Sequence, residues 1–433
     1  MRNSSRIGGA LLVSLMVLGA LQAHAELTAA DNHIAYYQRM LQRNPRDART
    51  YHRLGDALIR KARDSGDVTY FNRAEEALQK ALELAPNNAG AWRHLAYVAY
   101  SRHEFDQAAT HARKALELDR GDGHAWGVLG DALLETGRYA EAEDAYRRMI
   151  AIEADLHALG RMAGLKSMRG DTTGAVADLE RAVAEGRAAR RPAESVAWAL
   201  AQLGGEHFAV GQLDRAEARY LEALQTYPNY YRGLAGLGQV RAAQKRFEEA
   251  TDLYRRAMGI VPLPEYAAAL GDIFTKLGRV EEARKQYDLV EYIGRLNALN
   301  KILYSRELAY FYADRGVNLA TALEMAQGEL SLRRDVYAYD VLAWTLLKNG
   351  RAAEARAAIG EALKIGTKDA RLHFHAGLIH AALGEPDRAR EYLSRALANN
   401  PNFHVLHADV ARQTLASLER RTASGREVPG GQK

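Results

Sequence analysis

The chain has 433 residues, of which 48% are apolar, with 36 glycines, nine prolines, no cysteine and a formal net charge of +5. This apolar fraction is ordinary for a folded protein and excludes a mainly disordered chain. The absence of cysteine excludes disulfide scaffolds, thiol nucleophiles and cysteine-ligated metal sites. The 59 basic side chains are nearly balanced by 54 acidic ones, so the charge does not indicate a nucleic-acid partner.

Residues 1–25 have the layout of a cleaved secretory signal. Two arginines precede an uncharged, mostly apolar run over residues 7–21, and residues 23–25 are Ala-His-Ala, a small-x-small site. We predict cleavage after Ala25 and an exported protein, periplasmic in a bacterium with two membranes, or else secreted. A permanent membrane anchor is the alternative, although a spanning helix needs about 20 apolar residues.

Small residues and helix stops recur along the chain at a fixed interval. Trp92 and Trp126 lie 34 positions apart, and each is followed by a leucine and then by alanine or glycine. An alanine comes twelve positions after that small residue and another seven further on, in the series Ala96, Ala108, Ala115; Gly204, Ala216, Ala223; Gly238, Ala250, Ala257; Ala343, Ala355, Ala362; Gly377, Ala389, Ala396. Proline follows the last alanine at Pro86, Pro228, Pro262 and Pro401, and glycine precedes the middle alanine at Gly137, Gly170, Gly211, Gly278, Gly316, Gly350 and Gly384.

Each unit is predicted to be a pair of helices. The glycine supplies a left-handed residue that ends the first helix, and the proline ends the second because it cannot continue a helix. Small residues let the two helices cross closely, and the large side chains expected to fill the remaining space are Leu54, Leu129, Leu203, Leu237 and Leu342. The pattern resembles the tetratricopeptide repeat over about residues 31–403. That resemblance implies an all-α solenoid, a right-handed superhelix of about ten helix pairs with a C-terminal capping helix.

In chain order, Asn32–Asn44 is predicted to be a lone second helix, and full units start near residues 48, 89, 123, 156, 197, 231, 264, 302, 336 and 370. The first of them carries an insertion near Asp64–Asp67, and residues 291–301 are expected to extend a helix. We group the repeats into N-terminal units over 26–186, a linker at 187–196, middle units over 197–300 and C-terminal units over 301–403. A capping helix is predicted over 404–421 and a disordered tail over 422–433.

The sequence contains no Walker loop, no G-x-S-x-G and no H-E-x-x-H motif. The histidine cluster to consider is His373, His375 and His380. Packing with a satisfied hydrogen bond is the first interpretation of these histidines, and metal ligation is the alternative. We therefore predict no enzymatic activity, no cofactor and no metal. An enzyme with an unrecognised site is the alternative.

By the resemblance, the first helix of each unit lines an inner groove. The candidate partner-binding residues there are Arg93, Tyr97, Tyr100, Trp198, Phe208, Arg232, Arg306, Tyr310, Tyr337 and Trp344. Aromatic and arginine side chains are frequent energetic anchors of interfaces, and a groove lined by them suits an extended peptide or a helix. For each aromatic, packing between neighbouring units is the alternative. Family members that clamp a terminal carboxylate use lysine and asparagine, and asparagine is missing at the matching positions.

These observations together predict a non-enzymatic protein-interaction scaffold in the bacterial cell envelope, which binds a peptide or helix of a partner protein and is not inserted in a membrane after signal cleavage. The alternative is an accessory protein of exopolysaccharide or cellulose export. In that case the aromatic side chains would stack on sugar rings.

Overall fold

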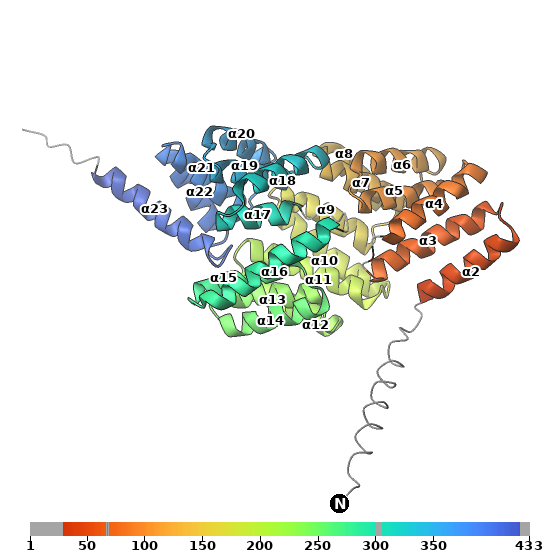
Figure 1. Ribbon diagram of the computed structural model, residues 1–433, viewed down its shortest axis with the longest axis horizontal. Helices are drawn as coiled ribbons and strands as arrows, with labels where there is room; N and C mark the ends of the chain where they lie inside the picture. The colour runs from red at the N-terminus through yellow and green to blue at the C-terminus, as the bar shows by residue number, and fades with distance from the viewer. Residues whose placement is uncertain (1–28, 66, 68, 300–304, 425–433) are drawn as a thin grey trace, which may run out of the picture. The chain divides into compact units, whose positions relative to one another are not determined.

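The computed structural model describes residues 29–65, 67, 69–299 and 305–424, which form helices joined by short turns (Figure 1). The predicted signal sequence lies outside the described residues, as does the predicted tail beyond residue 424. Within the described ranges, no helix is both long and apolar enough to cross a membrane.

The described part of the chain contains twenty-two helices. The helices in the N-terminal half are α2 (Ala29–Arg43), α3 (Ala48–Ser65), α4 (Thr69–Leu84), α5 (Ala89–Ser101), α6 (Phe105–Leu118), α7 (Gly123–Glu135), α8 (Tyr139–Ile152), α9 (Leu156–Met168), α10 (Thr172–Ala188), α11 (Ala193–Ala209) and α12 (Leu213–Thr226). Those in the C-terminal half are α13 (Tyr231–Ala243), α14 (Phe247–Ile260), α15 (Pro264–Lys276), α16 (Val280–Leu299), α17 (Ser305–Arg315), α18 (Leu319–Leu332), α19 (Val336–Lys348), α20 (Ala352–Leu363), α21 (Ala370–Ala382), α22 (Pro386–Asn399) and α23 (His407–Ser424). From α3 to α22 they follow the order of ten helix pairs, which confirms the predicted all-α repeat fold.

The helix starts agree with the predicted unit starts at eight of ten places, from Ala48 to Ala370. The repeat expected from residue 197 begins earlier, at Ala193, and the preceding helix α10 continues to Ala188. The predicted linker at 187–196 therefore contains the ends of both helices, and the turn between them is residues 189–192, in which Arg190 has a left-handed φ of 53° and Pro192 precedes the new helix. The capping helix expected over 404–421 spans His407–Ser424.

The backbone contacts divide the chain into two compact units, one ending at Val98 and one beginning at Ala99. This division falls within α5, and not at the predicted linker. We call them the first unit and the second unit, and describe each by itself.

The first unit has its own apolar core between α2, α3 and α4. Leu58 and Leu78 are almost completely buried there. Gly55 of α3 lies against Leu78 of α4, and a Cβ at Gly55 would come within 2.6 Å of that leucine side chain. The predicted insertion near Asp64–Asp67 corresponds in part to a longer first helix, since α3 continues to Ser65.

The turns inside the helix pairs use left-handed residues, as predicted. All seven glycines in the series have a positive φ, between 67° at Gly316 and 77° at Gly350. In two repeats without this glycine, His103 and Lys245 occupy the same position with a φ of 63° each. The turn geometry is therefore kept where the residue is not glycine, although a side chain in this conformation is strained.

The close crossing of the two helices depends on a residue sixteen positions after the small one. Tyr146 lies over Gly130, and Tyr220 lies over Gly204 in the same way. Leu393 takes this place against Gly377. The leucines expected to fill the space, such as Leu203, contribute to the surrounding core, but the side chain facing the glycine comes from the second helix.

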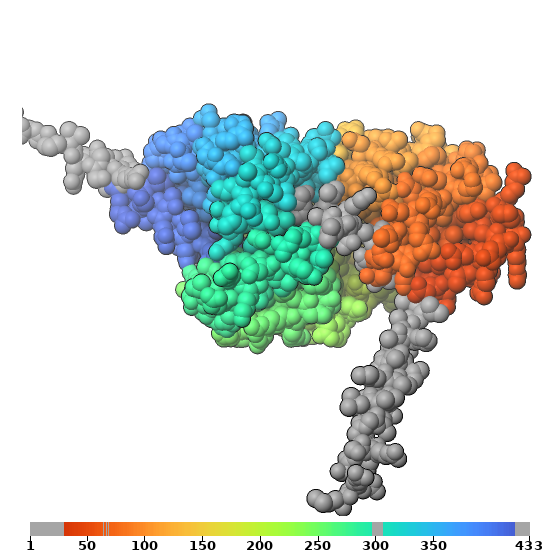
Figure 2. Space-filling view, in the orientation of Figure 1, coloured from red at the N-terminus to blue at the C-terminus, as the bar shows by residue number. Residues whose placement is uncertain are grey.

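Repeats far apart in sequence touch within the second unit. Arg333 and Glu135 form an ion pair of 2.8 Å across 198 positions. The backbone of Gly366 lies against Gly170, and Asn400 hydrogen-bonds to the carbonyl of Phe208. Figure 2 shows the blue surface of the C-terminal segment meeting the green surface of α15, where Lys276 pairs with Asp409. The second unit thus closes on itself around an inner surface.

Candidate functional site

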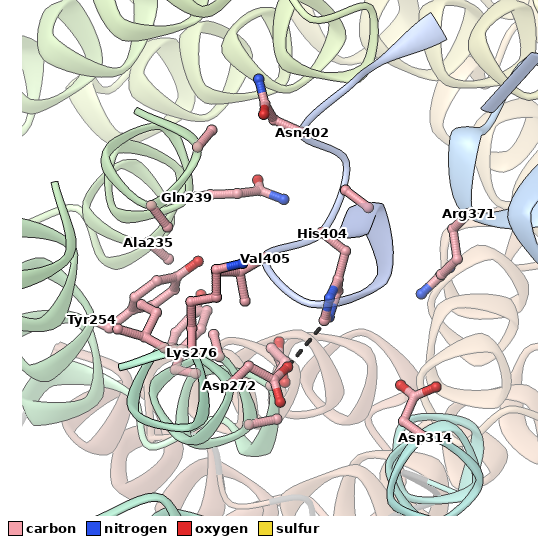
Figure 3. Close-up of a pocket in the computed structure, with 18 of the residues that line it drawn as sticks. Ala235, Gln239, Tyr254, Asp272, Lys276, Asp314, Arg371, Asn402, His404 and Val405 are labelled. Atoms are coloured by element: carbon pink, nitrogen blue, oxygen red, sulfur yellow. Dashed lines mark ion pairs between the residues drawn. The ribbon is translucent and has the colours of Figure 1, made fainter. Parts of the chain in front are cut away.

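The inner surface of the second unit encloses a cavity of about 980 Å³. Its walls are first helices of the repeats, α13, α15, α17 and α21, together with the segment that leads into α23 (Figure 3). Alanines of α13 and α15 make part of the wall smooth, including Ala235, Ala268 and Ala269. The volume lies at the upper end of the range typical of ligand pockets.

Two carboxylates on neighbouring first helices face histidines of the C-terminal segment. The His404 Nε2 lies 3.3 Å from the Asp272 Oδ2, as the dashed line in Figure 3 shows. The ring of His404 stacks on that of His407 with 4.1 Å between centroids, and the His407 Nε2 lies 3.6 Å from the Asp314 Oδ1. Trp344 donates to the same oxygen of Asp314 at 2.7 Å. The two histidines therefore connect the C-terminal segment to α15, α17 and α19.

The electrostatics of this cluster favour one charged and one neutral histidine. Burial opposes the charge of His404, but the hydrogen bond that it donates to Asp272 and the charges of Asp272 and Asp314 raise its pKa above the ordinary value. Burial, with the charge of His404 beside it, holds the pKa of His407 well below its ordinary value. Burial also raises the pKa of Asp314, although His404 and the Trp344 hydrogen bond act against that shift.

A second polar cluster lies behind this one. Asp340 accepts a hydrogen bond from the Tyr310 hydroxyl at 2.6 Å and lies 2.9 Å from the His375 Nδ1. The ring of His375 stacks on Trp344 at 4.1 Å. Asp340 and His375 are almost completely buried, with side-chain exposures of 0% and 1%. Despite that burial, which raises it, the pKa of Asp340 is lowered by His375, Arg371 and the Tyr310 hydroxyl.

Arg371 brings a positive charge to the opposite wall of the cavity. Its guanidinium lies over the ring of Tyr310 at 4.6 Å and is directed into the open space in Figure 3. Gln239 and Asn402 add neutral polar groups. The cavity therefore combines an apolar floor with positively charged, negatively charged and neutral polar side chains. Such a lining suits a peptide with varied side chains better than a uniformly charged ligand.

Three of the predicted partner-binding residues are buried in the structure. Trp344 is 1% exposed, between His375 and Phe374, while Phe208 is 6% exposed and Tyr310 is 8% exposed. A partner cannot reach the rings of Trp344 and Phe208 without displacing their neighbours. Trp344 and Phe208 therefore pack between neighbouring repeats, which was the alternative considered for the aromatic residues. Tyr310, by contrast, lines the cavity beneath Arg371.

Four other candidates lie in the second unit outside the cavity lining. Trp198 packs over Gly160, where a Cβ would come within 2.5 Å of the indole ring. Arg306 pairs with Glu329 and with Asp335, both at 2.9 Å. Tyr337 is half-buried, and its backbone carbonyl accepts a hydrogen bond from Tyr310. Arg232 is exposed and donates to the Tyr231 hydroxyl.

The remaining candidates belong to α5. In the first unit, Arg93 is hydrogen-bonded to His94 at 3.2 Å, and Tyr97 packs edge-on against Phe71. In the second unit, Tyr100 packs against Phe105 and its hydroxyl donates to Glu135 at 3.4 Å. Of the ten predicted residues, Tyr310 is the one that the described cavity lining includes.

The prediction missed Asp272, Asp314, Arg371 and His404. A signal for Asp272 was present, because it directly follows Gly271, the small residue of its repeat, as Asp131 follows Gly130. Tyr97 and Trp344 hold the same position in their repeats, directly after Ala96 and Ala343. His404 carried no such signal, since it belongs to the segment predicted to be a cap.

The histidine cluster divides into separate contacts. His375 is paired with Asp340, and the His380 Nδ1 lies 2.5 Å from the Glu385 Oε2. His373 lies near the side-chain amide of Asn399 at 3.4 Å. Among the residues that the structure describes, no group of three histidine, aspartate or glutamate side chains could hold a metal ion.

Comparison with solved structures finds other repeat proteins. A tetratricopeptide repeat protein from Parabacteroides merdae ATCC 43184 is 20% identical, with 61% of this chain and 98% of that chain covered and a TM-score of 0.35. YrrB, described as a TPR protein with an unusual peptide-binding site, is 22% identical over 43% of this chain and 94% of that chain, with a TM-score of 0.32. A chain of the APC/C hetero-tetramer Cut9-Hcn1 is 15% identical over 94% of this chain and 99% of that chain, with a TM-score of 0.33.

One curated relative is the small glutamine-rich tetratricopeptide repeat-containing protein 2 of Mycosarcoma maydis. It is 34% identical over 83 residues, which are 19% of this chain and 24% of that protein. The chain thus spans about a quarter of the length of this curated relative.

The paired helices, the left-handed turn residues and the shared inner surface define a helical repeat protein of the solenoid class. Models of the tetratricopeptide repeat match residues 59–122, 99–155 and 341–402, and a second model of the same repeat matches residues 207–273. The chain therefore contains tetratricopeptide repeats, as predicted.

Proposed function

We propose that the protein is a non-enzymatic interaction scaffold, whose second unit binds an extended segment of a partner protein in the inner cavity. The observation that carries this proposal is the cavity of about 980 Å³, walled by first helices of the repeats and lined by alanines beside groups of both charges. Its acidic groups Asp272 and Asp314 are already engaged with histidine, tryptophan or tyrosine side chains across helices. Such pairing suits a shaped binding surface and leaves no activated nucleophile among the contacts described.

A protein ligand is favoured over a polysaccharide by the burial of aromatic rings. Sugar stacking needs an exposed ring face, and the faces of Trp344 and Phe208 are covered by neighbouring side chains. A role in the export of exopolysaccharide or cellulose is therefore the second candidate function, after binding of a protein. Binding of a soluble glucan without any protein partner would support it.

The location in a bacterial envelope is part of the proposal, and it depends on the charged, apolar and small-residue pattern of residues 1–25. Mass spectrometry of the mature protein tests it directly. A mature chain that begins at Glu26 is expected. Recovery of Met1–Ala25 on the mature protein would contradict an exported scaffold.

Peptide display on the purified full chain tests the binding function. We expect selected peptides to bind the wild type and to lose at least tenfold in affinity on Ala268→Trp, because the added indole fills the cavity. The matched control is Gln327→Trp, which adds the same ring to an exposed position of the second helix α18. Equal loss in both variants, or no loss in either, would remove the cavity as the binding site.

A further inference from the structure

The segment from Asn400 to Arg412, which we call the strap, crosses the inner surface of the second unit. Besides the His407–Asp314 pair, three anchors attach it to α11 and α15. The side-chain amide of Asn400 donates to the carbonyl of Phe208 at 2.7 Å, His404 pairs with Asp272 at 3.3 Å, and Asp409 pairs with Lys276. These partners belong to α11 and α15, which are far from the strap in sequence. Phe208 precedes Asn400 by 192 positions, and Lys276 precedes Asp409 by 133 positions.

The strap forms one wall of the cavity proposed to bind a partner. Asn402, His404, Val405, Ala408 and Asp409 all line it, and Figure 3 shows the backbone of this segment running beside the open space. The strap therefore occupies part of the inner surface that the first helices α15 and α17 form. In particular, its two histidines cover Asp272 and Asp314.

Capping the last repeat does not require these contacts. The capping role belongs to the apolar face of α23, where Ala411 is fully buried and Leu415 and Leu418 pack on the C-terminal core. The polar contacts of the strap instead reach α11 and α15, on the other side of the inner surface. A cap would be complete without them.

Two of these three anchors are suited to exchange, whereas Asn400 is buried. The side chains of the His404–Asp272 pair are 29% and 16% exposed, and those of the Lys276–Asp409 pair are 32% and 40% exposed. Exposed ion pairs of this kind are individually weak. Detachment of residues 402–409 from the inner surface therefore breaks two weak ion pairs, while Ala411, Leu415 and Leu418 of α23 keep their apolar contacts.

We propose that the strap is an intramolecular ligand of the inner surface, which competes with the partner segment, and that the partner places a basic side chain against Asp272 and Asp314 where His404 now lies. This inference rests on the proposed function. The apparent affinity for a partner is then reduced by the fraction of molecules in which the strap is bound.

A labelled peptide copy of residues 400–412 is the probe for this competition, and full-length chains are the receptors. His404→Ala/Asp409→Ala removes two anchors and keeps Ala411, so the capping contacts remain. Glu354→Ala/Asp387→Ala is the matched control, because it removes two exposed ion pairs, with Arg351 and Arg390, on second helices. We expect the strap variant to bind the probe at least tenfold more tightly than the wild type and the control do.

Changes in the probe test the stated chemistry. A probe with His404→Lys should bind the strap variant at least as tightly as the original, and a probe with His404→Glu should lose at least tenfold, because it places a carboxylate against Asp272. Equal binding of the lysine and glutamate probes would overturn the basic side chain as the recognised group.

A locked strap gives a second, independent test. The chain has no native cysteine, so Lys276→Cys/Asp409→Cys can be bridged by a bismaleimide without side reactions. The bridged chain should bind the probe at least tenfold more weakly than the strap variant. Equal probe binding by the bridged chain and the strap variant would overturn the proposal. The proposal would also be overturned if hydrogen exchange shows that residues 400–412 of the strap variant are detached and the probe still does not bind.

The two proposals fail differently. If display yields peptides that bind the wild type and the strap variant equally, the inner surface binds partners and the strap does not compete. If neither displayed peptides nor the probe bind any variant, the proposed function itself is wrong.

Discussion

Asn400 donates its side-chain amide to the backbone carbonyl of Phe208 in a buried hydrogen bond of 2.7 Å, although the two residues are 192 positions apart. Asn400 is 1% exposed. The same carbonyl also accepts the amide of Gly211, which ends α11. This single side chain therefore ties the end of α22 to the end of α11, and with them two distant repeats of the second unit.

Asn400→Ala should destabilise the second unit by about 1–3 kcal/mol, because it removes the buried hydrogen bond to Phe208 and the one that the Asn400 side chain accepts from the Asn402 amide. The Phe208 carbonyl keeps its bond from Gly211, so no larger desolvation penalty is expected. Urea unfolding gives the free energy, and hydrogen exchange should rise at residues 208–211 and 400–404 together. Increased exchange at only one of these segments would show that the contact does not couple them.

Lys245→Gly should stabilise the protein by about 1 kcal/mol, because lysine there has a left-handed φ of 63° that glycine adopts without strain. The complementary change is Gly350→Ala, at the equivalent turn with a φ of 77° and with no atom within 4 Å of the added Cβ. It should destabilise by about the same amount. Thermal and urea unfolding measure both. Stabilisation by Gly350→Ala would contradict this explanation of the repeat turns.

Gly130→Ala should cost about 1–3 kcal/mol, because the added methyl would overlap the ring of Tyr146 and push the two helices of the repeat apart. Tyr146 is 1% exposed and hydrogen-bonds to Asp131 at 2.9 Å, so its ring cannot move aside freely. Gly328→Ala, in a helix and with no atom within 4 Å of the new methyl, is the control and should gain about 0.5–1 kcal/mol. The two changes are chemically identical, so opposite signs in urea unfolding would isolate the helix crossing as the cause.

Attachment of the strap should be strongest near pH 6.5, the ordinary pKa of histidine. The pKa of His404 is raised, so its contribution is complete below 6.5 and is lost as the pH rises through the raised value. The pKa of His407 is lowered, so burial of its neutral ring favours the strap above 6.5 and increasingly opposes it as the pH falls. Hydrogen exchange of residues 400–412 across this range measures the effect.

Variants assign the two limbs of that profile. His404→Ala should remove the loss of protection on the alkaline side, and His407→Phe should remove the loss on the acidic side. The charged or titratable groups that face these two rings are Asp272, Asp314, Arg371, His375 and Lys348. A profile that keeps both limbs in both variants would place the titration on one of those groups instead.

Local features of this fold were predictable from residues close together in sequence. The seven turn glycines are left-handed, and the helices before Pro86, Pro228, Pro262 and Pro401 end where proline requires them to. The failures have a physical reason too. The leucine pattern indicated which residues are buried, but it did not show which side chain faces each glycine, because Tyr146 and its equivalents come from the second helix, sixteen positions further on.

The candidate site was less predictable. Aromatic and arginine residues at groove positions were expected to be available to a partner, and the structure uses Trp344 and Phe208 in packing instead. An aromatic side chain has the same sequence position whether it contacts a partner or a neighbouring repeat. The outcome depends on what the neighbouring repeats place against it, here His375 and Phe374 in the case of Trp344.

The sequence by itself determined that the chain folds as a series of helix pairs, because each pair is specified by small residues, turn residues and helix stops within about 34 positions. Only the tertiary structure decided that distant repeats of the second unit meet. Their contact results from small rotations that accumulate over many repeats, and no local pattern records that sum. The closure places His404 against Asp272 and Arg371 across the cavity, and it thereby creates the site from residues that have no common motif.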